Sequence, residues 1–323
     1  MDAPKSPPVY KDRRTGLLIF GVIEILLGCL CLLLVPLILF GHVMGAKATG
    51  KPPDYKVIMP SVIMYPFLAV AFVWLGIGSI KKRRWARAVS LIIGWAWLLA
   101  GVAGIVGFVT MGPAIFSGAA GGQPLPPGAR IVMLVTAALM LGVFFVAAPA
   151  TLILFYRSPH VRATCEAADP HPAWTDACPL PVLAVSLWLL VAALWMPLMP
   201  LFYNSVMPFF GILLQGIAGT LVFLVLAVLW LYAAWSLYRL KPIGWWITAI
   251  TMGLLVISSA ITFSSIDIME MYRAMGYSEE LLQQMQQMKF SGRQFTIWGV
   301  IGGALMLGYL IFIYRYFRRP GLA

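Results

Sequence analysis

Long apolar stretches dominate this chain and leave few folds open to it. Of its 323 residues, 61% are hydrophobic and 11% are charged, whereas about a quarter of the residues in soluble domains are charged. About 20 apolar residues in a helix span the roughly 30 Å hydrocarbon core of a bilayer and satisfy their own backbone hydrogen bonds. The stretches do not alternate in polarity as barrel strands do, so they predict membrane-spanning helices.

The sequence predicts eight such helices in an all-α polytopic membrane protein. The predicted spans cover residues 17–40, 58–80, 86–111, 130–155, 181–203, 213–237, 244–264 and 295–316. The apolar stretch from 207 to 238 is longer than one crossing requires, and glycines interrupt its first part. One interpretation of that first part is a short helix that does not span the membrane.

Lysine and arginine are concentrated in alternate loops, which predicts the orientation of the chain. Sixteen of the 23 Lys and Arg residues lie in the two terminal segments and in the loops after the second, fourth and sixth spans. Loops that stay in the cytoplasm are richer in these residues. Both termini are therefore predicted to be cytoplasmic.

The most cationic of these loops lies in residues 80–90, IKKRRWARAVS. Its charge is expected to hold a short turn at the cytoplasmic face, with the tryptophan at headgroup level. A net charge of +12 would suggest nucleic acid in a soluble protein, but here the expected acidic partner is anionic lipid headgroups. The residues assigned to this role are Lys81, Lys82, Arg83, Arg84, Trp85 and Arg87.

The same turn carries a family resemblance. The helix end Gly76-Ile77-Gly78-Ser79 followed by Arg83-Arg84-Trp85-Ala86-Arg87 resembles a hairpin of uncharacterised bacterial multi-pass inner-membrane proteins. The similarity covers mainly the second and third spans. It implies a bacterial cytoplasmic membrane and implies no activity.

The two halves of the chain align at an offset of 161 residues, which predicts a tandem repeat. Val35-Pro36-Leu37 aligns with Met196-Pro197-Leu198, and residues 155–159 align with 316–320. Four crossings return the chain to its starting side, so the units would form a parallel 4+4 bundle. The predicted domains are a first unit over 1–160, an extended, proline-rich cytoplasmic connector over 161–180, and a second unit over 181–323 with an extracytoplasmic helical lid over 267–292.

Glu24 is the only acidic residue well inside a predicted span. An ionised carboxylate in the membrane costs a few kcal/mol on insertion scales. Because Gly21, Gly28 and Cys31 share its helical face, we expect Glu24 to face other helices. It is either a proton-relay or ion-coupling site, or a neutral carboxyl group hydrogen-bonded within the packing.

A second polar group ends the seventh span, in SSAITFSSID at residues 258–267. Ser258, Thr262 and Ser265 share one helical face and, with Asp267, would line a polar path. Alternatively, these side chains bond back to the backbone of their own helix, which is the interpretation we favour.

Soft metal ligands occur in two segments, but neither fits a usual metal site. The methionines of the lid suggest Cu(I), yet no Cys or His joins them. The predicted cytoplasmic loop over 160–178 holds His160, Cys165, His171 and Cys178 without the C-x-x-C pairs typical of structural zinc sites. We therefore predict no metal, no cofactor and no disulfide.

Common catalytic motifs are also absent from the sequence, which argues against an enzyme. There is no phosphate-binding G-x-x-x-x-G-K-[ST], no H-E-x-x-H and no G-x-S-x-G. The favoured function is a membrane scaffold, assembly factor or sensor component. The alternative is a small-solute or proton-coupled transporter that uses Glu24 and the polar end of the seventh span. The expected partners are the lipid bilayer and either another membrane protein or a second copy of the chain.

Overall fold

A computed structural model of the chain describes residues 10–50, 55–119, 127–287 and 292–318, and these are almost entirely helical. The predicted all-α polytopic fold is confirmed, because eight helices in the described residues are long and apolar enough to cross a membrane. They cover Arg14–Ala48, Val57–Ile80, Arg84–Thr110, Ile131–Arg157, Leu180–Phe202, Gly216–Tyr238, Pro242–Ser265 and Thr296–Phe317. Each prediction from the sequence overlaps one of these helices.

The outward-facing side chains of these helices are large and apolar. Examples that are more than two-thirds exposed are Val70, Leu154, Ile217 and Leu305. Soluble monomers rarely expose apolar surface on this scale, and lipid tails are the medium in which such a surface is stable. The chain is thus built as a multi-pass integral membrane protein.

The chain divides into two compact units. Unit 1 comprises Met1–Gly107 with Arg130–Asp176, and unit 2 comprises Phe108–Ala129 with Ala177–Ala323. The elements from the first part of the chain are α1 (Arg14–Thr49), α2 (Tyr55–Ile80), α3 (Arg84–Ala119), α4 (Pro127–Gly142), the π-helical turn η1 (Val143–Ala147), α5 (Ala148–Arg157) and α6 (Pro159–Ala168). The remaining elements are η2 (Trp174–Ala177), α7 (Leu180–Trp195), η3 (Met196–Leu198), α8 (Met199–Phe202), β1 (Met207–Phe209), β2 (Ile212–Leu214), α9 (Gly216–Tyr238), α10 (Pro242–Ser265), α11 (Ile268–Ala274), α12 (Glu279–Gln287) and α13 (Gly292–Arg318).

In unit 1, α1 and α2 pack closely through glycines. A Cβ atom built on Gly21 would lie 2.7 Å from the Gly76 carbonyl oxygen, and one built on Gly76 would lie 2.5 Å from the Gly21 carbonyl oxygen. Gly28 meets the backbone of Ala69 in the same way, with its Cβ 2.9 Å from that carbonyl oxygen. Small residues at an interface let two helix backbones approach closely, and the resulting van der Waals packing helps to associate helices in lipid.

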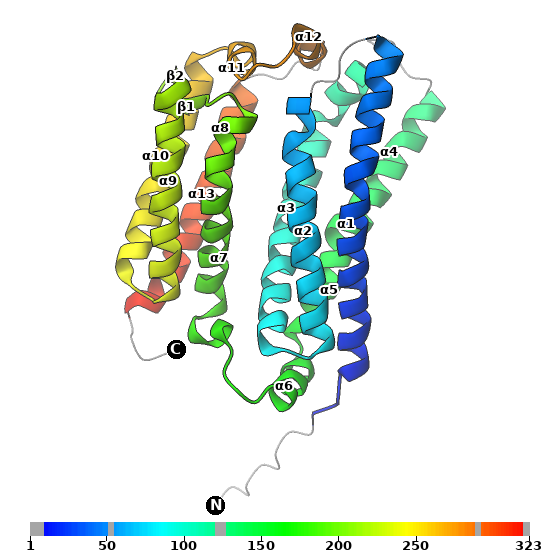
Figure 1. Cartoon of the computed structure of the whole chain (residues 1–323), viewed down its shortest axis with the longest axis vertical. Helices are drawn as coiled ribbons and strands as arrows, with labels where there is room; N and C mark the ends of the chain where they lie inside the picture. The colour runs from blue at the N-terminus through cyan, green and yellow to red at the C-terminus, as the bar shows by residue number, and fades with distance from the viewer. Residues whose placement is uncertain (1–9, 51–54, 120–126, 288–291, 319–323) are drawn as a thin grey trace, which may run out of the picture. The chain divides into compact units, whose positions relative to one another are not determined.

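In unit 2, the four long helices α7, α9, α10 and α13 are grouped together (Figure 1). They form a closed ring, because α7 contacts α9, α9 contacts α10, α10 contacts α13 and α13 contacts α7. Polar side chains join neighbouring helices of this ring. The Trp230 indole donates to the Thr251 hydroxyl at 3.1 Å, and the Trp245 indole donates to the Leu310 carbonyl at 2.7 Å. These bonds satisfy indole N–H groups that lipid cannot satisfy.

The segment before α9 is a β-hairpin, so the interpretation of a short helix there is wrong. Strands β1 and β2 pair antiparallel, with Phe209 opposite Ile212. The two turn residues, Phe210 and Gly211, both have left-handed φ angles, of 44° and 89°. Two consecutive left-handed residues are what a tight hairpin turn with the natural strand twist requires.

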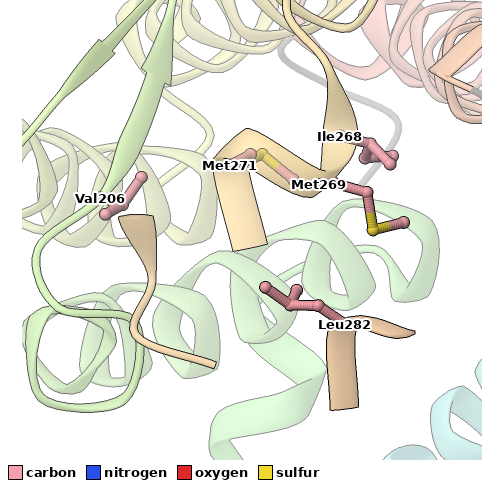
Figure 2. Close-up of a cluster of buried hydrophobic side chains, with 5 residues drawn as sticks. All are labelled: Val206, Ile268, Met269, Met271 and Leu282. Atoms are coloured by element: carbon pink, nitrogen blue, oxygen red, sulfur yellow. The ribbon is translucent and has the colours of Figure 1, made fainter. Parts of the chain in front are cut away.

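A small apolar core joins α11 and α12 of the lid to the residue before β1. Figure 2 shows Ile268, Met269 and Met271 from α11 gathered with Leu282 from α12 and with Val206. Arg273 also donates to Glu279 at 2.9 Å, between the end of α11 and the start of α12. The described part of the lid is therefore helical and packed, and Met269 and Met271 are core side chains.

The connector contains a helix, so the expectation of an extended chain over 161–180 is wrong for its first part. Helix α6 begins at Pro159 and ends at Ala168. Its Val161 and Cys165 side chains are buried. Pro159 stands at the first helical position, where its missing N–H is not needed, so this proline starts a helix instead of preventing one.

The turns after α2 and after α9 have the same geometry. The Arg83 N–H bonds to the Gly78 carbonyl around Lys82, which has a φ of 56°. In unit 2 the Lys241 N–H bonds to the Ser236 carbonyl around Leu240, which has a φ of 53°. Each is a Schellman-type helix end. The shared turn agrees with the tandem repeat, which itself stays a prediction.

Substitution of Gly21 by alanine tests the close packing of α1 on α2. We expect Gly21→Ala to lower the free energy of unfolding by about 1–3 kcal/mol, the usual range for overpacking, because the new methyl group would strike the α2 backbone. Thermal unfolding in detergent measures the change. Gly41→Ala on the same helix is the matched control, since its Cβ would meet nothing within 4 Å. Equal stability of the two variants would contradict the packing.

Candidate functional site

Glu24 lies at the centre of a buried cluster of four oxygen-bearing side chains in unit 1. Ser79 contacts its Oε2 at 2.9 Å, while Ser90 and Tyr156 contact its Oε1 at 2.9 and 3.2 Å. The Ser79 and Tyr156 hydroxyls are also 2.7 Å apart. Because Glu24 is on α1, Ser79 on α2, Ser90 on α3 and Tyr156 on α5, this Glu24 cluster joins four helices of the unit.

The helical face of α1 explains why Glu24 points inward. Leu17, Gly21 and Gly28 are spaced around Glu24 at intervals of three or four residues and share its face. Leu17 is buried, and the two glycines meet the α2 backbone. With 4% of its surface exposed, Glu24 is buried as the sequence predicted. The proton-relay role stays a hypothesis.

The partners of Glu24 were missed from the sequence. In the sequence, Ser79 stands out only as part of a helix end, Ser90 only as the end of the stretch 80–90, and Tyr156 only within the aligned segment 155–159. One signal was available: Ser79 is two residues from Lys81, Ser90 is three from Arg87, and Tyr156 adjoins Arg157. If these cationic turns lie at one membrane face, as the sequence predicts, polar residues next to them lie at a similar depth in the membrane. Their side chains can then reach a carboxyl group near that face.

Two of the residues at the end of α10 hold the β-hairpin in place. The Phe210 N–H donates to the Ser258 hydroxyl at 2.9 Å, and the Gly211 N–H donates to the Thr262 hydroxyl at 3.0 Å. Thr262 also donates to the Ser258 carbonyl, one turn back on its own helix. Ser258 and Thr262 thus satisfy the backbone donors of a turn that lipid would leave unpaired.

Ser265 and Asp267 do not join this pair. Ser265 is exposed and donates to the Ile261 carbonyl at 2.8 Å, as the favoured interpretation expected. Asp267 caps α11 by accepting from the Met269 N–H at 3.1 Å. It also lines a shallow surface depression of about 320 Å³, together with residues that include Ser264 and Thr296. Glu24 belongs to unit 1, whereas the four residues of the predicted polar path, Ser258, Thr262, Ser265 and Asp267, belong to unit 2.

Part of the cationic turn is paired with carboxylates of unit 1. Arg84 lies 3.2 Å from Asp176 and 3.7 Å from Glu166, and Arg83 lies 3.3 Å from Asp169. The Arg84 N–H also reaches Asp169 at 3.4 Å. Helix α6 and the residues after it therefore dock on the α2–α3 turn through an ion-pair network. Arg83 and Arg84 were assigned to lipid headgroups, and the structure gives them protein partners as well.

The other residues assigned to headgroups differ in exposure. Lys81 is exposed and Lys82 is half-buried at the left-handed position of the turn. Trp85 stacks on Trp74 with ring centroids 4.1 Å apart, so part of its surface packs against α2. Arg87 is half-buried, and its Nε has no hydrogen-bond partner among the described residues. Contact with anionic headgroups stays a prediction for this set.

In the loop over 160–178, His160 has a hydrogen-bond partner and the two cysteines are buried. The His160 Nδ1 accepts from the Lys11 N–H at 3.3 Å. Burial raises the pKa of Cys165 to about 11 and that of Cys178 to about 12, so both thiols stay protonated at neutral pH. Metals bind the thiolate form. Within the described ranges, no group of three or more His, Cys, Asp or Glu side chains could hold a metal ion, and the cysteines are free.

The methionines of the lid are apolar packing groups. Met269 and Met271 are buried in the core of Figure 2, and Met275 and Met285 pack against it. Met288 lies outside the described residues. Thioethers that face a hydrophobic core act as adaptable filler.

Comparison with known proteins supplies no relative from which a function could be inferred. No family model matches the chain, and neither a curated protein nor a solved structure matches it. The resemblance of the cationic turn to bacterial inner-membrane proteins accordingly stays a prediction.

Neutralisation of Arg84 tests the docking of α6. Arg84 is one-fifth exposed and its two partners are more exposed. We therefore expect Arg84→Gln to lower the free energy that stabilises the docked α6 by about 1 kcal/mol. That loss corresponds to about fivefold faster amide hydrogen exchange in α6 if α6 opens as a unit. Hydrogen-exchange mass spectrometry of residues 159–168 measures the rate. Lys81→Gln, which removes the same charge from an exposed position in this turn, should leave the rate unchanged. Unaltered exchange in Arg84→Gln would rule out the ion-pair docking.

Proposed function

We propose that this chain is a structural component of a membrane: a scaffold, assembly factor or sensor component whose helical units are fixed internally. The observation that carries this proposal is the Glu24 cluster. Both oxygens of the carboxyl group are engaged by hydroxyls of the same unit. A buried polar network that is satisfied in this way rigidifies packing and specifies one arrangement of helices.

The polar end of α10 supports the same proposal. Ser258 and Thr262, which a transport path would need, accept hydrogen bonds from the backbone of the β-hairpin. Side chains committed to holding a turn are poorly placed to bind a solute. The hairpin and the packed lid are features that a protein with a structural role would need at its membrane boundary.

We also propose that the protein resides in a bacterial cytoplasmic membrane with both termini in the cytoplasm. The support comes from the distribution of Lys and Arg between alternate loops and from the resemblance of the cationic turn. In this orientation Lys81 and Lys82 face anionic headgroups, and α6 lies on the cytoplasmic side. A second copy or another membrane protein would be the partner of the scaffold.

A proton-coupled transporter is the second candidate, and one observation favours it. The oxygens of Tyr156, Ser79 and Glu24 contact one another in succession. A hydroxyl group both donates and accepts, so this succession could pass a proton. Transport would additionally require water to reach the cluster from one side of the membrane.

Access of water to the Glu24 cluster distinguishes the two candidates. Ser90→Cys places a small thiol beside Glu24, in a variant whose four native cysteines are replaced by serine. We expect this thiol to resist a membrane-impermeant maleimide until the protein is unfolded, because Ser90 is 2% exposed. The reaction is followed in intact and in permeabilised cells. Labelling of Ser90→Cys in the folded protein would refute the structural proposal and favour transport.

The exposed Lys81→Cys is the matched control for this experiment. A cytoplasmic turn predicts that this thiol reacts only after the cells are permeabilised. Reaction at Lys81→Cys in intact cells would place the turn on the opposite face and refute the proposed orientation.

A further inference from the structure

The Glu24 cluster contains more short oxygen–oxygen contacts than its hydroxyl groups can fill with protons. Five oxygens make four contacts: Ser79–Oε2 at 2.9 Å, Ser79–Tyr156 at 2.7 Å, Ser90–Oε1 at 2.9 Å and Tyr156–Oε1 at 3.2 Å. The first three lie within the usual range of O–H···O hydrogen bonds, and the fourth is slightly longer. Two oxygens at such distances repel each other unless a proton lies between them.

Three hydroxyl groups carry three protons, which is one fewer than the contacts. The single Ser79 proton can point to Glu24 or to Tyr156, and the same limit applies to the Tyr156 proton. An ionised carboxylate only accepts hydrogen bonds. If Glu24 were ionised, one of the four contacts would therefore have no proton of its own.

A proton on the Glu24 carboxyl group supplies the fourth proton, so that each of the four oxygen–oxygen contacts has one. The Oε2–H of the acid would donate to Ser79, Ser79 would donate to Tyr156, and Tyr156 would donate to Oε1. Ser90 would also donate to Oε1 without being part of this ring. Glu24, Ser79 and Tyr156 then form a closed ring in which each residue donates once. Hydrogen bonds arranged head to tail polarise and strengthen one another.

The surroundings of the carboxyl group favour the same state independently of this count. Among the residues that the structure describes, the side chains hydrogen-bonded to the Glu24 oxygens are the neutral hydroxyls of Ser79, Ser90 and Tyr156, and 4% of the glutamate is exposed. A buried carboxylate without a positive partner is costly, and a neutral acid escapes that cost. Arg87, one turn before Ser90 on α3, is the nearest cation along that helix, and its side chain lies within electrostatic range of Cys165 and Glu166 of α6.

We propose that Glu24, Ser79, Ser90 and Tyr156 form a proton-binding site in which one proton, held as the Glu24 carboxylic acid, closes a hydrogen-bond ring between α1, α2 and α5. The bound proton acts as a structural ligand of unit 1. This inference rests on the Glu24 cluster that carries the proposed function, and it names the ligand of that cluster.

Infrared spectroscopy of the purified protein at neutral pH tests the proposal, because acid and carboxylate forms absorb at different frequencies. The wild-type spectrum minus that of Glu24→Gln should show the carbonyl stretch of one protonated carboxyl group. Glu166→Gln, which removes an ion-paired carboxylate from α6, should retain this band and lose carboxylate absorption. Loss of carboxylate absorption in Glu24→Gln, with no loss in the acid region, would overturn the proposal.

A second variant keeps the test decisive if Glu24→Gln does not fold. Tyr156→Phe removes one donor to the Glu24 carbonyl oxygen, so the acid band should move to higher frequency while remaining present. A spectrum without an acid band in both the wild type and Tyr156→Phe would overturn the proton site. That outcome would leave the maleimide test of the structural role untouched, since an ionised cluster can also be closed to water.

Discussion

Hydrocarbon offers no hydrogen bonds, and this lack constrains nearly every feature of the structure. Each polar group that enters the membrane must find a partner in the protein, or it costs several kcal/mol. Long helices meet the requirement for the backbone. The Glu24 cluster meets it for a carboxyl group, and Ser258 and Thr262 meet it for the N–H groups of the hairpin turn. The same constraint thus produces both the fold and its polar sites.

The two polar sites fix structure in different ways. In unit 1 the cluster ties α1, α2, α3 and α5 together at one point, while glycine contacts bring α1 and α2 close along their length. In unit 2 the hydroxyls of α10 hold a short hairpin beside the lid core. Ion pairs at α6 add a third constraint outside the apolar spans. Such internal satisfaction favours a structural role over solute binding.

The spans were predictable because their signal is local. A window of about 20 apolar residues identifies a crossing whatever surrounds it, and all eight were found. The inward orientation of Glu24 was also readable, since its neighbours on the helical face are glycines. The helices predicted in the lid also have local signals at their ends, since Gly276, which follows α11, has a left-handed φ of 86° and Ser278 directly precedes α12.

Features that depend on distant contacts were missed. The hairpin turn is held by Ser258 and Thr262, about 50 residues further along the chain, so its own sequence resembled an interrupted helix. Helix α6 docks on Arg84, which is more than 70 residues earlier, whereas the prolines that suggested an extended connector, Pro170, Pro172, Pro179 and Pro181, all follow this helix. Ser79, Ser90 and Tyr156 are ordinary residues until four helices bring them to one carboxyl group.

A double-mutant cycle between Ser79 and Tyr156 measures whether the cluster acts as one unit. The free energy of unfolding in detergent is compared for Ser79→Ala, Tyr156→Phe and the double variant. Each single change should lower the free energy of unfolding by about 1–3 kcal/mol, because it leaves buried hydrogen-bonding groups unpaired. The double variant should be more stable than the sum of the single losses predicts, by about 0.5–3 kcal/mol. Losses that add within about 0.5 kcal/mol would contradict the account.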